Sequence, residues 1–181
     1  APLEIEMICS THGPVWTEHI STIIELYRRL GAGETEEGIV VAYGSMYGNT
    51  QRVAEAIAEG AAEAGVRKIV VHNLSVSQPS YVLRDIYKGL AIGGPTYNSE
   101  LFPVVNDMME RLCGRKVSNH VLAAFGGFSW AGQAVKILEK YNERMKMEMV
   151  DAPVEWKQGA NPDVLERARE LGRRLAAAVK A

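Results

Sequence analysis

The chain has 181 residues, of which 47% are hydrophobic, and this length supports one sizeable core with at most a small appendage. Its net charge of −2 gives no general attraction to nucleic acid or to an anionic membrane, and no apolar run approaches the roughly 20 residues that span a bilayer. Without a signal segment, and with only Cys9 and Cys113 outside any C-x-x-C spacing, we expect a cytoplasmic protein with reduced thiols.

The first 37 residues form a segment of their own. Residues 3–8 alternate into a short strand without an obvious partner, which is expected to fray or to pair with another chain. A helix is expected from Thr17, with apolar side chains at helical spacing. Residues 31–37 combine glycines with an acidic run and are interpreted as a linker, so we place a domain boundary there.

From residue 38 onward, strands and helices alternate. The expected strands cover residues 39–43, 68–73, 89–93, 117–125 and a half-exposed run containing Met145, Met147 and Met149. The first expected helix covers residues 50–64 and is ended by Gly65, and the second covers residues 79–87. The third contains Leu101, the fourth begins near Ala131, and the last is opened by Asn161 and Pro162.

Five strands alternating with five helices predict an α/β, doubly wound, three-layer sandwich with a five-stranded parallel sheet in the order 2-1-3-4-5. In such sheets, ligands bind beyond the carboxyl ends of the strands where the strand order reverses. We therefore expect the loops after the first, third and fourth strands to form the site. The turns at residues 73–75 and 156–159 are predicted to be ordinary.

The first loop, residues 43–50, reads Y-G-S-M-Y-G-N-T and joins a buried strand to a helix. Backbone N–H groups and the positive end of a helix make such a turn an anion site. Asn49 stands where an ATP-binding loop needs lysine, and G-x-G-x-x-G is absent. The neutral donors Ser45, Asn49 and Thr50 suit one phosphate monoester. The alternative is a glycine turn capped by Asn49 or Thr50.

The second and third loops each carry a large aromatic residue. Tyr97 follows Pro95 and Thr96, while Trp130 stands in the glycine-rich residues 126–132. Two aromatic rings facing one pocket would form a slot for a flat heteroaromatic ring. The alternative is that both rings pack on neighbouring helices. A planar ring on a short chain ending in phosphate describes flavin mononucleotide, FMN.

These loops resemble the flavin loops of flavodoxin-like domains, and S-M-Y-G-N-T with F-S-W-A-G is most similar to the flavodoxin domain of flavodiiron proteins, the A-type flavoproteins. The resemblance covers about residues 38–181 and implies that the first loop contacts the phosphate and ring while the other two enclose the ring. The implied FMN-binding residues are Ser45, Met46, Tyr47, Gly48, Asn49, Thr50, Pro95, Thr96, Tyr97, Asn98, Gly127, Phe128, Ser129, Trp130 and Gly132.

The resemblance extends upstream. Residues 10–16, S-T-H-G-P-V-W, resemble the end of the metallo-β-lactamase-like domain of that family, where the histidine at the position of His12 is an iron ligand. The other ligands, including an H-x-[EH]-x-D-H motif, are absent from this sequence, so we expect His12 to bind no metal. The implied organisation is a domain remnant plus linker over residues 1–37 and an FMN-binding domain over residues 38–181.

The resemblance implies electron transfer from rubredoxin, or a similar reductase donor, through FMN to a di-iron centre that reduces nitric oxide or dioxygen in a homodimeric protein. No catalytic side chain is expected on this domain, since a flavin carries the redox chemistry. The three loops contain no Asp or Glu, so we expect little repulsion of a reduced flavin. The alternatives are a free-standing flavodoxin-like electron carrier, an NAD(P)H:quinone reductase, and a non-catalytic module that binds phosphate adventitiously.

Overall fold

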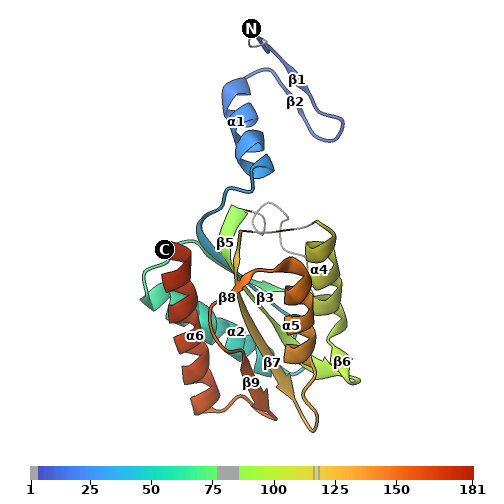
Figure 1. Cartoon of the computed structure of the whole chain (residues 1–181), viewed down its shortest axis with the longest axis vertical. Helices are drawn as coiled ribbons and strands as arrows, with labels where there is room; N and C mark the ends of the chain where they lie inside the picture. Colours follow the sequence, from blue (N-terminus) through green and yellow to red (C-terminus); the bar gives the residue numbers. More distant parts are fainter. Residues whose placement is uncertain (1–3, 77–85, 116, 118) are drawn as a thin grey trace. The chain divides into compact units, whose positions relative to one another are not determined.

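The computed structural model describes residues 4–76, 86–115, 117 and 119–181 (Figure 1). The chain divides into two compact units, Ala1–Glu34 and Thr35–Ala181. Because β3 of the second unit begins at Glu36, residues 36 and 37 belong to a strand and not to the predicted linker. Glu36 pairs with Tyr87 of β5, and its carboxylate lies 3.0 Å from Lys68 Nζ.

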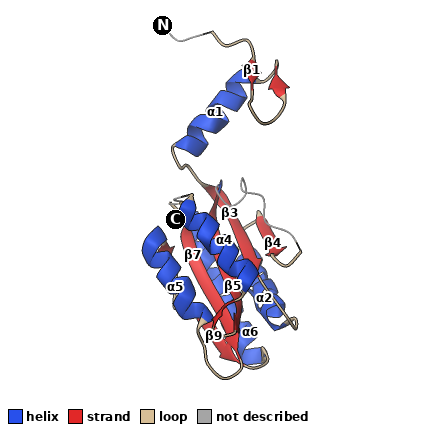
Figure 2. Ribbon diagram, turned by 90° about the vertical axis from the view of Figure 1, so that its right-hand side faces the viewer, coloured by secondary structure: helices blue, strands red, loops and turns tan. Residues whose placement is uncertain are grey.

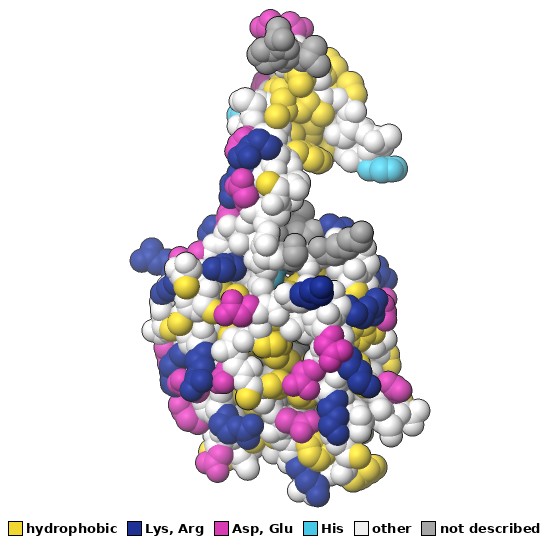
Figure 3. Space-filling view, in the orientation of Figure 1, with side chains coloured by type: hydrophobic (Ala, Val, Ile, Leu, Met, Phe, Trp, Pro, Cys, Tyr) yellow, Lys and Arg dark blue, Asp and Glu magenta, His cyan; other side chains and the backbone are white. Residues whose placement is uncertain are grey.

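The N-terminal unit holds a short hairpin and one helix, namely β1 (Ile8–Cys9), β2 (Val15–Trp16) and α1 (Ile20–Gly31). Of the predicted strand over residues 3–8, only Ile8 lies in a strand within the described part, and its partner Trp16 belongs to the same chain. The helix begins at Ile20 and not at Thr17, because His19 has a left-handed φ of 57°. Hydrophobic side chains gather on one side of this unit (Figure 3).

The second unit is built on one mainly parallel sheet. Its strands are β3 (Glu36–Tyr43), β4 (Ile69–Asn73), β5 (Tyr87–Tyr97), β6 (Glu100–Leu101), β7 (Val121–Phe128), β8 (Glu148–Met149) and β9 (Val154–Lys157). The order is β4-β3-β5-β7, and β8 and β9 both pair with β7, while β6 pairs antiparallel with β5. The predicted order 2-1-3-4-5 is confirmed, with the fifth strand divided into β8 and β9.

The described helices of this unit are α2 (Asn49–Glu63), α4 (Pro103–Gly114), α5 (Ala134–Met145) and α6 (Pro162–Lys180). Figures 1 and 2 show α2 and α6 on one face of the sheet and α4 and α5 on the other. Each face buries its own core, because successive strand residues point to opposite sides. In β3, Ile39 and Val41 pack under α2 and α6, whereas Val40 and Ala42 pack under α4 and α5.

Several element boundaries differ from the predicted ones. Leu101 lies in β6 and Met145 ends α5, although they were expected in a helix and in a strand respectively. Tyr87 opens β5, and the predicted helix over residues 79–87 otherwise falls, apart from Ile86, outside the described residues. Burial on both faces removes the periodicity that would mark such ends in the sequence.

Two predicted helix ends are confirmed. Gly65, just after α2, has a φ of 88°, which a residue without a Cβ adopts without steric cost. Asn161 precedes α6, and its Oδ1 accepts a hydrogen bond of 3.0 Å from the backbone N–H of Val164. Among the helices in the described ranges, none is long and apolar enough to cross a membrane.

Candidate functional site

The carboxyl ends of β3, β5, β7 and β9 meet at one end of the second unit, the lower end in Figure 1. The loops that follow these strands enclose a pocket. Its lining residues are Ser45, Met46, Tyr47, Asn49, Thr50, Pro95, Thr96, Gly127, Phe128, Ser129, Trp156 and Gln158. Ten of the fifteen residues predicted for the FMN site therefore line one pocket. The other five, which are not among the lining residues, are Gly48, Tyr97, Asn98, Trp130 and Gly132.

The first loop presents the start of α2 to the pocket. Gly48 adopts a φ of 82°, and its backbone N–H donates to Ser45 Oγ at 3.1 Å, which closes the turn before the helix. In the part of the chain that the structure describes, no side chain caps α2 and no acidic residue stands in its first turn. The alternative of a turn capped by Asn49 or Thr50 is therefore wrong. The first N–H groups of the helix and its positive end are left for an anion.

Asn49 is the first residue of α2 and also makes a hydrogen bond to a loop that is distant in the sequence. Its Oδ1 accepts a hydrogen bond of 3.3 Å from the backbone N–H of Ala160, which lies between β9 and α6. This contact ties the first loop to the loop after β9. Because the amide oxygen already has a donor, Asn49 has its N–H donors left to offer an anion.

The second loop is stiffer than the sequence indicated, because β5 continues through Pro95 and Thr96 to Tyr97. Thr96 Oγ1 accepts from the backbone N–H groups of Gln133 and Ala134, at 3.0 and 3.1 Å. This pair of hydrogen bonds holds the start of α5, and with it the third loop, against the end of β5.

Tyr97 and Trp130 do not face each other across the pocket. The Tyr97 ring packs edge-on against Phe102, with ring centroids 5.9 Å apart. Trp130 is 89% exposed and, with Asn98 and Ser129, lines an adjoining hollow. Tyr97 therefore rests on Phe102, which precedes α4, and stays 46% exposed, while Trp130 stands in solvent at the rim.

Sequence reasoning missed the contribution of β9. Trp156 and Gln158 line the pocket, so the turn at residues 156–159 is not the ordinary turn that was predicted. Trp156 pairs in register with Gly127 of β7, and the backbone N–H of Gln158 donates to the carbonyl oxygen of Phe128 at 2.7 Å. The available signal was the alternation of Val154 and Trp156 ahead of a break, but a four-residue strand carries little periodicity.

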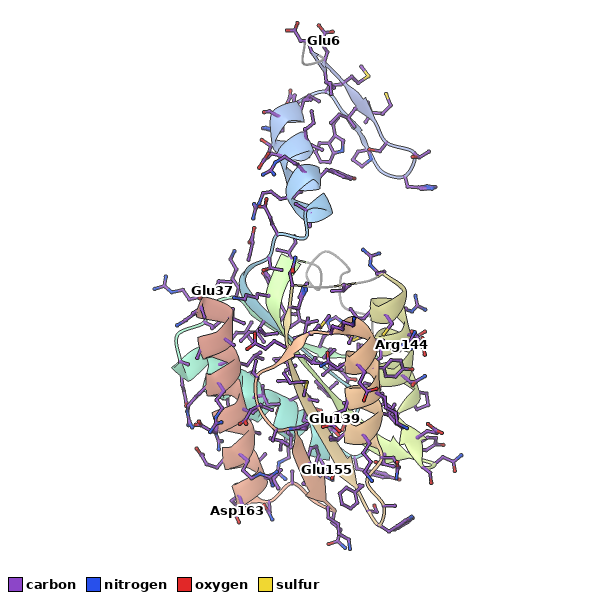
Figure 4. The ribbon with its side chains drawn as sticks, in the orientation of Figure 1. Glu6, Glu37, Glu139, Arg144, Glu155 and Asp163 are labelled. Atoms are coloured by element: carbon purple, nitrogen blue, oxygen red, sulfur yellow. The ribbon has the colours of Figure 1, made fainter. Side chains whose placement is uncertain are left out.

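An acidic side chain also reaches the third loop. Glu155, labelled in Figure 4, follows Val154 on β9, and a Cβ built on Gly132 would lie 2.6 Å from its Oε1. The expectation that the loops are free of acidic residues holds for their sequence, but the fold brings this carboxylate to Gly132. Among the described lining residues of the pocket itself, none is charged.

A metal site built on histidine was the other kind of site to examine. Within the described ranges, no three His, Cys, Asp or Glu side chains gather in a group that could hold a metal ion. His12 is exposed on the loop between β1 and β2. The pocket of neutral donors is therefore the candidate site.

Comparison with known proteins agrees with this geometry. Residues 41–172 match the flavodoxin family. The chain is 34% identical to a nitric oxide reductase of Moorella thermoacetica over 98% of its own length and 45% of that protein. It is 33% identical to the anaerobic nitric oxide reductase flavorubredoxin of Escherichia coli O1:K1 over 96% of its own length and 37% of that protein.

Among solved structures, the flavodiiron protein of Giardia intestinalis superposes with a TM-score of 0.85 at 27% identity, covering 98% of this chain and 46% of that one. The chain thus spans less than half the length of these relatives. The resemblance to the flavodoxin-like part of flavodiiron proteins is confirmed by these matches. Since the family match covers most of the chain, the chain belongs to the flavodoxin family.

Proposed function

We propose that the second unit binds FMN in the pocket at the carboxyl end of its sheet and acts as an electron-transfer domain. The observation that carries this proposal is the uncapped start of α2, which opens into a pocket whose described walls are uncharged. A phosphate monoester held by neutral hydrogen bonds suits that end. Bound FMN supplies one- and two-electron redox chemistry.

The proposed contacts divide between the two ends of the ligand. The first loop, with Ser45, Gly48, Asn49 and Thr50, holds the phosphate through hydroxyl, amide and backbone donors. The ring lies beside Met46 and Tyr47 and between the second and third loops. The residues proposed to enclose it are Pro95, Thr96, Tyr97, Asn98, Gly127, Phe128, Ser129, Trp130 and Gly132. Of these, Tyr97, Asn98, Trp130 and Gly132 form the outer rim.

The names of the relatives support a wider proposal for a longer protein. A nitric oxide reductase and a flavorubredoxin are redox enzymes, and the solved relative is a flavodiiron protein. We propose that this domain takes electrons from a rubredoxin-like or reductase donor and passes them to a di-iron centre on a second domain. That centre would reduce nitric oxide or dioxygen in a cytoplasmic homodimer.

Titration of the chain with FMN tests the binding step. FMN fluorescence should be quenched on binding, and inorganic phosphate should compete only weakly because it lacks the ring contacts. Ser45→Ala removes the hydroxyl that closes the turn, and should weaken FMN binding about tenfold, which is the effect of one hydrogen bond to a charged group.

Ser75→Ala is the matched control, because Ser75 is exposed after β4 and its backbone N–H donates to Asn73 Oδ1. This variant should bind FMN like the unaltered chain. If the unaltered chain leaves FMN fluorescence unchanged at saturating protein, the proposed function is wrong.

A further inference from the structure

The indole of Trp156 has an unusual environment. Trp156 is 4% exposed. Its indole nitrogen, Nε1, is buried and has no hydrogen-bond partner within the described residues. An indole N–H is a donor only. A buried donor without an acceptor loses its hydration without compensation, so such atoms in folded proteins call for an explanation.

The position of the indole is set by Gly127. The two residues are paired across β7 and β9, and a Cβ built on Gly127 would lie 2.7 Å from Trp156 Cζ2 and 3.0 Å from Nε1. Any side chain at residue 127 would displace the ring. The absence of a Cβ thus lets the N–H edge of the indole lie directly against the third loop, where both residues line the pocket.

The indole also lies on the same side of the sheet as the start of α2. Trp156 packs in the core under α2 and α6 together with Val53 from the first turns of α2. The hydrogen bond from Ala160 to Asn49 Oδ1 draws the loop after β9 to the first residue of that helix. The indole and the start of α2 therefore lie on the same face of the sheet, and the loop that follows β9 reaches the first residue of that helix.

We propose that Trp156 Nε1–H donates a hydrogen bond to the phosphate monoester of the bound flavin. This inference rests on the proposed function and adds a fourth strand end to the site. An indole N–H needs a lone-pair atom as its acceptor, and a charged phosphate oxygen forms a stronger bond with a neutral donor than a neutral acceptor does. Thr50, Ser45 and the start of α2 would surround the same phosphate.

The direct test is nuclear magnetic resonance on the chain with ¹⁵N-labelled tryptophan. Three indole signals arise from Trp16, Trp130 and Trp156. Trp16→Phe and Trp130→Phe each delete one of these signals, which assigns Trp156 by elimination even if Trp156→Phe fails to fold. On addition of FMN, the Trp156 signal should move downfield and its N–H should exchange more slowly with solvent, whereas saturating riboflavin, which lacks the phosphate, should cause neither change.

The affinities of tryptophan variants for FMN and riboflavin provide a second test. Trp156→Phe keeps an aromatic ring without the donor and should weaken FMN binding about tenfold while changing riboflavin binding less than twofold. Trp16→Phe lies in the other unit and should change neither. Trp130→Phe should weaken both flavins alike, because Trp130 lies at the rim proposed for the ring.

The two proposals fail separately. If FMN binds but the Trp156 signal does not move, or moves equally with riboflavin, the inference is overturned and the proposed function stands. If the unaltered chain does not bind FMN, the proposed function fails, and the inference fails with it.

Discussion

At the scale of single residues, Tyr141 illustrates how one polar group is satisfied between two helices. Its hydroxyl, on α5, lies 2.8 Å from Glu110 Oε1 and 2.9 Å from Asn106 Oδ1, both on α4. Arg144 lies over the same ring, 5.5 Å from its centroid. Burial, with the nearby Glu110 carboxylate, raises the pKa of Tyr141 to about 12.

This shift predicts how stability depends on alkaline pH. In the unfolded chain, the pKa of a tyrosine is about 10. Below that pH, the hydroxyl is protonated in both states, so its stabilising contribution is fully present. Between pH about 10 and pH about 12, the unfolded state loses its proton first, so the free energy of unfolding falls as the pH rises.

Tyr141→Phe should therefore cost roughly 1 kcal/mol near neutral pH and flatten the alkaline fall in stability. Urea unfolding of both proteins across that pH range measures the difference. Tyr27→Phe is the control, because Tyr27 is 70% exposed and should leave the curve unchanged. Parallel curves for the unaltered chain and Tyr141→Phe would contradict the assignment.

At the scale of elements, α2 and α6 approach each other closely through two glycines. A Cβ on Gly60 would fall on the carbonyl oxygen of Arg169, and one on Gly172 would fall on that of Ile57. Ion pairs of 3.1 Å flank the contact, from Arg169 to Glu59 and from Arg173 to Glu63. The backbones of the two helices are thus in contact, and the helices pack as one layer on this face of the sheet.

Gly172→Ala should consequently destabilise the fold by about 2–3 kcal/mol, because the added methyl has to push two helix backbones apart. Gly114→Ala is the matched control, since nothing lies within 4 Å of a Cβ at that helical position. It should stabilise by up to about 1 kcal/mol through helix propensity. Equal denaturation midpoints for the two variants would show that the helices move apart without a loss of folding free energy.

The sequence reveals long strands better than short ones. Residues 39–43 are apolar without interruption and predict a central parallel strand, whose burial on both faces the structure confirms. β8 has two residues and β9 has four, which is too few for a hydrophobic pattern to appear. From the sequence alone, the alternating methionines at residues 145–149 are therefore interpreted as the fifth strand. Met145 ends a helix instead, because its neighbours Tyr141 and Leu138 continue the buried face.

At the scale of the whole molecule, contacts distant in the sequence decide what lines the site. The first, second and third loops can be found from local composition, because glycine and aromatic residues gather after apolar runs. The contact of Asn49 with Ala160, across 111 positions, leaves no such trace. Likewise, Glu155 seems remote from the third loop until β9 pairs with β7 and brings its carboxylate to Gly132.

The charge of Glu155 predicts an effect on the redox potential of bound FMN. Charged residues of both signs are scattered over the visible face of the molecule (Figure 3), while the described lining residues of the pocket are uncharged. Glu155 is therefore a negative charge beside the site whose removal should favour an added electron. Glu155→Gln should raise the potential by an amount on the order of 10–30 mV, given solvent screening of a partly exposed charge.

A potentiometric titration followed by flavin absorbance measures this shift. Glu37→Gln, at an exposed position near the amino end of β3, removes the same charge at the opposite end of the sheet from the pocket (Figure 4) and should leave the potential within error of the unaltered protein. Raising the salt concentration should shrink the Glu155 effect, because screening acts on the same interaction. If both variants move the potential equally, net charge alone sets it, and the position of the Glu155 carboxylate beside Gly132 has no influence on the flavin.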